Sequence, residues 1–198
     1  MDRVLDRHRD ADLHLRQNVC PVAPFGGSRM ISRDALNKIK RFEGFAPLEY
    51  TCVAGKRTIG YGHVLRPDEN YVAGVTEKQA EILLAQDVAA AEAVVDGGVE
   101  VDLCCRQREA LVSFAFNVGA RAFFLSSLRR VLNAGHYDQV PQQMMRWVYA
   151  NGKICAGLVK RRRAEAFWFS GKTPAACQKK TERQKRSVFS SLQRKEKK

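Results

Sequence analysis

The sequence predicts an α+β fold that is mostly helical and contains one small β-sheet. Apolar residues recur at helical spacing in several capped segments, the longest of which begins at Thr76. A single Gly-rich segment, residues 48–63, instead has the turn residues and short apolar runs of paired strands. Apolar residues form 45% of the 198 residues and charged residues 28%, so the chain is globular rather than disordered.

The first predicted helix runs from the N-cap Ser32 to Gly44, a residue type that commonly ends helices. Its apolar positions have helical spacing: Leu36, Ile39 and Phe42. Glu43 is then its last residue, where the helix dipole and apolar neighbours disfavour a charged carboxylate. Such a position suits the protonated carboxyl group that a general acid needs, although an ordinary surface glutamate at a frayed helix end fits the same pattern.

Two contrasting segments follow. Residues 48–63 are expected to form a small twisted sheet, with a turn at residues 54–56 between two short strands. A long helix then begins at Thr76, which forms a capping box with Gln79, and ends at the glycine pair 97–98. Its apolar stripe predicts one buried face: Ala80, Leu83, Leu84, Val88, Ala91 and Val95.

The remaining segments are predicted to be helical. A helix capped by Asp102 and reaching Val118 is apolar on nearly every face, which predicts the buried centre of a helical region. Further helices are expected at residues 126–134, 139–150 and 157–169, separated by glycines. Four aromatic residues are expected in the core, with a rim tryptophan stacked on a sugar as the functional alternative: Trp147, Phe167, Trp168 and Phe169.

Three polar residues near the first helix have a specific spacing. Eight residues separate Glu43 from Cys52, and five separate Cys52 from Thr58, which opens the run Thr-Ile-Gly-Tyr-Gly-His. This pattern resembles the phage-type lysozymes, or endolysins, of glycoside hydrolase family 24, whose motif is E-(8)-D/C-(5)-T. The resemblance covers roughly residues 31–171 and continues downstream at residues 76–88, 114–119 and 157–164.

The resemblance implies a fold, a reaction and a set of roles. The fold would be lysozyme-like, with a small β-sheet lobe and a larger helical lobe joined by the long helix. The reaction would be that of a muramidase: hydrolysis of the β-1,4 bond between N-acetylmuramic acid and N-acetylglucosamine in peptidoglycan, with inversion, for host cell lysis. Glu43 would protonate the leaving oxygen, Cys52 would handle the water or stabilise the developing positive charge, and Thr58 would orient the water.

Cys52 is the position at which this chain departs from the commoner aspartate. An ordinary thiol has a pKa of about 8.5, so only a few per cent is ionised near neutrality. The residue could act as a base, as a nucleophile, as a water-positioning group or as a small apolar residue in the strand. His63, at the end of the motif, is expected to be a structural hydrogen-bonding residue beneath the site.

The catalytic domain is expected at residues 30–171, between a flexible leader and a basic tail. Residues 1–29 have no apolar run for a secretory signal or membrane anchor, and Met30 is an alternative native start. Residues 172–198 hold ten basic and two acidic residues, which is +8 of the net +13 charge of the chain. The six cysteines and four histidines have no metal-ligand spacing, so the sequence predicts no metal or cofactor.

Three functions fit these observations. The first is a monomeric endolysin that acts on peptidoglycan, stays in the cytoplasm until a holin-type pore releases it, and contacts the anionic envelope through its tail. The second is a catalytically weakened cell-wall-binding protein of the same fold, which the cysteine at position 52 favours. The third is a nucleic-acid or membrane-surface binder acting through the basic tail, although no specific nucleic-acid partner is expected.

Overall fold

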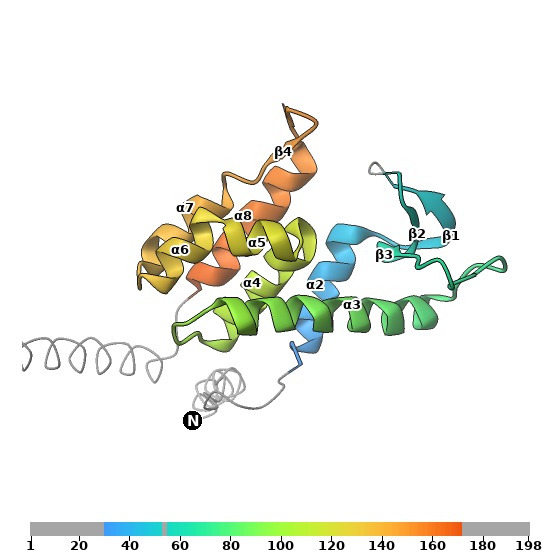
Figure 1. Cartoon of the computed structure of the whole chain (residues 1–198), viewed down its shortest axis with the longest axis horizontal. Helices are drawn as coiled ribbons and strands as arrows, with labels where there is room; N and C mark the ends of the chain where they lie inside the picture. Colours follow the sequence, from blue (N-terminus) through green and yellow to red (C-terminus); the bar gives the residue numbers. More distant parts are fainter. Residues whose placement is uncertain (1–29, 53–54, 172–198) are drawn as a thin grey trace, which may run out of the picture. The chain divides into compact units, whose positions relative to one another are not determined.

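The computed structural model describes residues 30–52 and 55–171 and confirms the mostly helical α+β fold. Figure 1 shows α3 running lengthwise, with the three-stranded sheet near its first turns and the other helices near its last turns. The elements are α2 (Arg33–Glu43), β1 (Ala46–Thr51), β2 (Arg57–Gly60), β3 (His63–Val64), α3 (Glu77–Gly98), α4 (Cys105–Val118), α5 (Ala120–Leu125), α6 (Ser127–Asn133), the 3-10 helix η2 (Tyr137–Gln139), α7 (Val140–Met144), β4 (Tyr149–Ala150), β5 (Lys153–Ile154) and α8 (Ala156–Ser170).

Two helix starts follow the predicted capping chemistry. The Ser32 hydroxyl accepts a hydrogen bond from the backbone of Ala35 at 3.2 Å, and α2 ends at Gly44, whose φ of 72° favours glycine. Thr76 and Gln79 form the predicted capping box at the start of α3. The end of α2, and with it the position of Glu43, is therefore fixed by local sequence.

The three strands form an antiparallel sheet in the order β1-β2-β3, with an irregular register between Ala46 and Tyr50. The sheet packs on α3 through Gly60, which has a φ of 65°. A Cβ atom placed on Gly60 would lie 2.9 Å from the Ala80 Cβ, which is closer than non-bonded carbon atoms approach each other in proteins. The glycine therefore allows β2 to lie directly against the first turns of α3.

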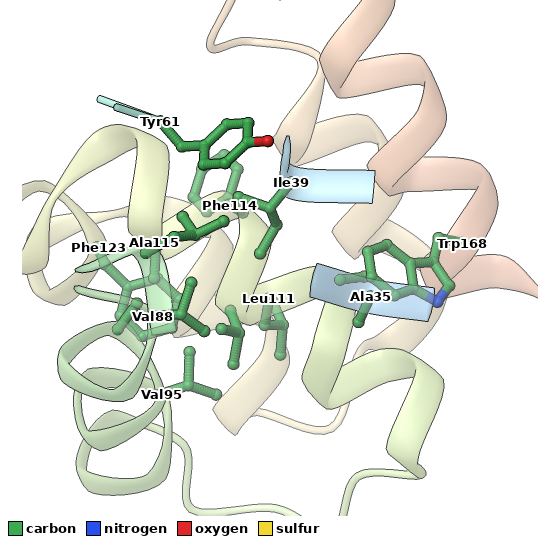
Figure 2. Packing of buried hydrophobic residues seen from close by; sticks show 14 of the residues in the cluster. Ala35, Ile39, Tyr61, Val88, Val95, Leu111, Phe114, Ala115, Phe123 and Trp168 are labelled. Atoms are coloured by element: carbon green, nitrogen blue, oxygen red, sulfur yellow. The ribbon is translucent and has the colours of Figure 1, made fainter. Parts of the chain in front are cut away.

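The core is centred on α4, which packs against both α3 and α8. The apolar residues of α4 predicted to be buried are buried, apart from the half-buried Phe116: Ala110, Leu111, Val112, Phe114 and Ala115. Figure 2 shows Leu111 and Ala115 of α4 facing Val88 and Val95 of α3. Burial of these side chains stabilises the packing that joins the two helices.

Several predicted boundaries are wrong. The helix expected at 139–150 is η2 followed by the short α7, and the chain then turns into the β4–β5 hairpin. Pro141 lies in the first turn of α7, and the positive φ of Asn151 and Gly152 pairs Tyr149 with Ile154. Helix α5 was not expected.

The cap of α4 is also different from the prediction. Cys104, rather than Asp102, occupies the N-cap, and its backbone N–H donates to Gln107 Oε1 at 3.1 Å. Of the aromatic residues expected in the core, Trp168 and Phe169 are buried, whereas Phe167 is 82% exposed.

The leader and the tail lie outside the described residues. In the part of the chain that the structure describes, no helix combines the length and the apolar character needed to span a bilayer.

Candidate active site

Glu43 stands at the edge of a cavity of about 430 Å³ between the sheet, α3 and α4. Its side chain is 20% exposed, so the carboxyl group is accessible but mostly surrounded by protein. The other walls come from the sheet, from α3, and from α4 with the start of α5: Gly62, Val64, Asp87, Ala90, Ala91, Val94, Ala115, Phe116, Asn117, Gly119 and Ala120. A carboxyl group in a cavity of this kind is a candidate for proton transfer to a bound ligand.

Arg161 of α8 is the main partner of Glu43. Its Nη1 donates to Glu43 Oε1 at 2.5 Å, and its guanidinium group lies 5.1 Å from the centre of the Phe42 ring. The Arg161 side chain is only 5% exposed. This charge-assisted hydrogen bond, between residues 118 positions apart, was missed by the sequence analysis, which gave the basic run at 160–163 no role in the site.

A second arginine contacts Asn117, one of the residues that line the cavity. Arg162 has no exposed surface, stacks on the Phe114 ring at 4.7 Å from its centre, and donates to the side chain of Asn117. Burial lowers the pKa of Arg162 to about 10, against the attraction of Glu165, so its guanidinium is still charged near neutrality. Asn117 is thereby fixed at the boundary between this cavity and a second one.

The second cavity, of about 390 Å³, lies beyond Asn117 on the side of the β4–β5 hairpin. Its walls include two aromatic side chains, one basic and one aliphatic: Trp147, Tyr149, Arg146 and Leu158. Trp147 is half-buried and packs edge-on against Phe114, with 5.6 Å between ring centres. Trp147 therefore contacts the core, as predicted, and also lines a cavity; its stacking on a sugar stays a prediction.

Cys52 and Thr58 lie on the sheet side of Glu43. Cys52 follows β1, is half-buried and keeps its thiol, and its backbone N–H donates to the Lys56 carbonyl at 2.9 Å. Thr58 in β2 is 3% exposed, and its hydroxyl donates to the same carbonyl at 3.0 Å. Among the described residues that line the Glu43 cavity, neither of the two is present.

Tyr50 lies close enough to both Glu43 and Cys52 for their charges to affect its phenol. Burial, followed by the nearby charges of Glu43 and Cys52, raises the pKa of the Tyr50 phenol. The Tyr50 ring is 43% exposed, and it lies within electrostatic reach of both predicted site residues. The sequence analysis gave Tyr50 no role, because a tyrosine in a strand is common and carries no signal of its own.

The residues after Thr58 connect the sheet to α3, to Glu43 and to the loop that follows β3. Tyr61 donates to Glu77 Oε1 of α3 at 2.7 Å, and Gly62, with a φ of 87°, lies beside Glu43. The ring of His63 is 4% exposed, with Nδ1 at 2.8 Å from Asp87 and Nε2 at 3.1 Å from Glu69. His63 is thus a structural hydrogen-bonding residue, as predicted. The described residues contain no cluster of ligands that could hold a metal ion.

Comparisons with known proteins show which proteins this chain is similar to. The Phage lysozyme family model matches residues 40–165. The endolysin of Acyrthosiphon pisum secondary endosymbiont phage 1 is 39% identical over 143 residues, which is 70% of this chain and 97% of the relative. The endolysin of Bacillus phage B103 is 40% identical over 141 residues, and the match covers 70% of this chain but only 53% of that relative. Among solved structures, the muramidase domain of SpmX from Asticaccaulis excentricus superposes with a TM-score of 0.66 at 35% identity, over 73% of this chain and 98% of that one.

Proposed function

The chain belongs to the phage lysozyme family, and on that premise we propose that it is an endolysin with Glu43 as its general acid. It is a glycoside hydrolase of the lysozyme class. Its substrate is bacterial peptidoglycan, in which it cleaves the β-1,4 bond between N-acetylmuramic acid and N-acetylglucosamine.

The observation that carries this proposal is the placement of the Glu43 carboxyl group. One oxygen, Oε1, accepts the hydrogen bond from Arg161, whereas Oε2 lies beside Gly62 at the cavity. Oε2 is therefore the oxygen that faces the glycosidic oxygen of a bound glycan and donates the proton to it. Proton donation weakens the bond to the leaving sugar and allows positive charge to develop at the anomeric carbon.

Cys52 and Thr58 complete the site in this proposal. In an inverting reaction a water molecule attacks the anomeric carbon from the face opposite the leaving group, so a second group must orient that water or accept its proton. The Thr58 hydroxyl already donates to the Lys56 carbonyl, which leaves its oxygen able to accept a hydrogen bond from water. Cys52 follows β1, which pairs with the strand that carries Thr58, and supplies the base or the polar contact for the same water.

One experiment separates this function from its main alternative, a cell-wall-binding protein that has lost its activity. Clearing of a chloroform-treated Gram-negative cell suspension is measured for the wild type and for Glu43→Gln, together with pelleting on purified cell walls. If the protein is an enzyme, the wild type clears the suspension and Glu43→Gln does not, while both proteins bind the walls. Wall binding without clearing by the wild type would establish the alternative, which the thiol at position 52 favours.

The route to the cell wall is part of the same proposal. We infer that the protein acts as a monomer and reaches peptidoglycan through a holin-type pore made by a separate protein. Expression with and without a pore-forming partner tests the route, and lysis that begins without the pore would contradict it. Gel filtration with light scattering tests the monomer.

A further inference from the structure

A group of four charged side chains lies beneath the Glu43 cavity, contributed by α2 and α8. It contains two guanidinium groups and two carboxyl groups: Arg161, Arg162, Glu43 and Glu165. Only Glu43 reaches the cavity, since the Arg161 side chain is 5% exposed and the other two are fully buried. Buried charges are expensive unless they are paired and hydrogen-bonded, so the arrangement needs an explanation.

Arg161 is held on three sides. Its Nε donates to Glu165 Oε1 at 3.0 Å, its Nη2 donates to the Ser113 carbonyl at 3.2 Å, and its Nη1 donates to Glu43. The Ser113 hydroxyl also donates to Glu165 Oε1, at 2.7 Å. The same carboxylate oxygen therefore receives hydrogen bonds from α4 and from Arg161, and it determines where the guanidinium plane lies.

The contact of Glu165 with the other arginine is of a different kind. Arg162 Nη1 lies 2.9 Å from Glu165 Oε2, but neither atom makes a hydrogen bond of acceptable geometry within the described residues. The directional bond of Glu165 therefore goes to Arg161, whereas Arg162 contributes only charge. Simple neutralisation of buried arginines would not need this preference.

We propose that Glu165 is a positioning residue that, through Arg161, fixes the Oε2 oxygen of Glu43 toward the substrate. The inference rests on the proposed function of Glu43 as general acid. Arg161 and Glu165 are four residues apart on α8, whereas Glu43 ends a different helix, so the arginine carries the orientation from the core to the cavity. The planar guanidinium group, with its fixed fork of donors, can bind all three acceptors at once.

This role predicts a specific kinetic defect. Glu165→Gln should lower kcat by about 10- to 100-fold, because a misplacement on the order of 1 Å can cost that much, and leave KM within about twofold. The assay uses soluble, uncrosslinked glycan fragments, at a temperature where circular dichroism shows each variant to be folded. Two-dimensional NMR of arginine Nε–H groups gives a second readout, in which the Arg161 signal should exchange faster with solvent, because a neutral amide oxygen accepts a weaker hydrogen bond than a carboxylate does.

Two further variants separate positioning from charge balance. The double variant Arg162→Met/Glu165→Gln removes one buried charge of each sign, so the net charge beneath Glu43 is the same as in the wild type. Positioning predicts that its kcat stays as low as that of Glu165→Gln. Recovery of wild-type kcat in the double variant would show that Glu165 serves only to neutralise Arg162, and would overturn the proposal.

Glu92→Gln is the matched control. Glu92 is 9% exposed and accepts from Arg108 at 3.0 Å, so the variant breaks a buried carboxylate–guanidinium pair that does not face the cavity. It should lose stability without losing kcat. A fall in kcat for Glu92→Gln equal to that for Glu165→Gln would contradict a specific role for Glu165.

Ser113→Ala serves as a milder probe if Glu165→Gln does not fold. It removes one hydrogen bond to Glu165 Oε1 and leaves every charge in place, so kcat should fall about two- to tenfold. An unchanged kcat would contradict the proposal, because it would show that loosening Glu165 Oε1, the oxygen that orients Arg161, has no effect on the rate. Activity of the wild type and inactivity of Glu43→Gln on the same fragments test the proposed function separately.

Discussion

Two groups of charged side chains lie beside the Glu43 cavity, and they differ in whether their charge changes with pH near neutrality. On the sheet side, His63 bridges Asp87 of α3 and Glu69 of the following loop. On the helix side, Arg161 bridges Glu43 and Glu165. An arginine stays charged near neutrality, whereas a histidine changes its charge there.

The difference separates two tasks. The His63 group attaches the sheet to α3 and makes that attachment depend on pH. The Arg161 group sets the orientation of one carboxyl group through guanidinium groups, which keep their charge near neutrality. Substitutions on the sheet side should therefore change stability and its pH dependence, while substitutions on the helix side should change the rate.

The largest effect is expected for Glu43→Gln, on the helix side. Loss of a general acid costs about 10²–10⁴-fold, so lysis of cell walls should be abolished at ordinary enzyme concentrations. Thermal unfolding followed by circular dichroism checks that the fold is intact. A Gln variant that clears walls at nearly the wild-type rate would remove Glu43 from the mechanism and make the two sides equivalent.

Cys52 gives the next largest effect and tests whether the sheet side has any catalytic part. Cys52→Asp should retain or raise activity near pH 7, because a carboxylate with a pKa of about 3.9 is ionised there. Cys52→Ser should be less active than Cys52→Asp, and Cys52→Ala should lose on the order of 10²-fold. The ranking is measured as initial rates of wall clearing, and full activity of Cys52→Ala would leave the residue with a packing role only.

A third effect concerns stability. Burial of the ring lowers the pKa of His63, but the hydrogen bonds with Asp87 and Glu69 outweigh burial and raise it above the ordinary value. The folded protein therefore keeps this proton to a higher pH than the unfolded chain does. The resulting stability is complete below about pH 6.5 and is lost as the pH rises through the raised pKa of the folded state.

His63→Asn should accordingly lose about 1.5–3 kcal/mol at pH 6 and less at pH 9, with a nearly unchanged kcat. Urea unfolding at several pH values measures the effect. His136→Asn, at an exposed histidine without an ion pair among the described residues, is the control and should leave the pH dependence unchanged. If His63→Asn lowered the free energy of unfolding equally at pH 6 and pH 9, the charge of His63 would not contribute to stability.

The smallest effect is expected for removal of residues 172–198. Their +8 charge should act at long range on anionic envelope surfaces and be screened by salt. Truncation should lower lysis of whole envelopes a few-fold at low ionic strength and leave hydrolysis of short soluble glycans unchanged. An equal loss on both substrates would indicate that these residues support the catalytic domain itself.

The sequence predicted the local structure around the site better than its long-range contacts, for a physical reason. Ser32, Gly44 and the Thr76–Gln79 capping box act within a few residues, so their effect on helix ends is local and readable. The motif from Glu43 to His63 is also contiguous. Arg161 contacts Glu43 only because α8 packs on α4 and passes the end of α2, and no local pattern encodes that approach.

Some errors had a visible source. The helix expected at 139–150 ignored Pro141 and the Asn151-Gly152 pair, which favours a tight hairpin turn. The Arg161–Glu165 spacing of four residues, with the apolar run 166–169 directly after Glu165, could have indicated a buried ion pair. Cys104 as an N-cap had no such signal, because cysteine is not among the residues that commonly cap helices.

The contact between Gly60 and Ala80 limits how this enzyme can be evolved in the laboratory. The two positions share one space, so a methyl group added to either would act as a wedge that lifts β2, and Thr58 with it, away from α3. Glu43 would stay behind on α2, and the gap between the two halves of the site would widen. A mutant library should therefore keep both residues fixed and place its diversity at exposed strand positions such as Val64, which borders the cavity without holding the sheet in place.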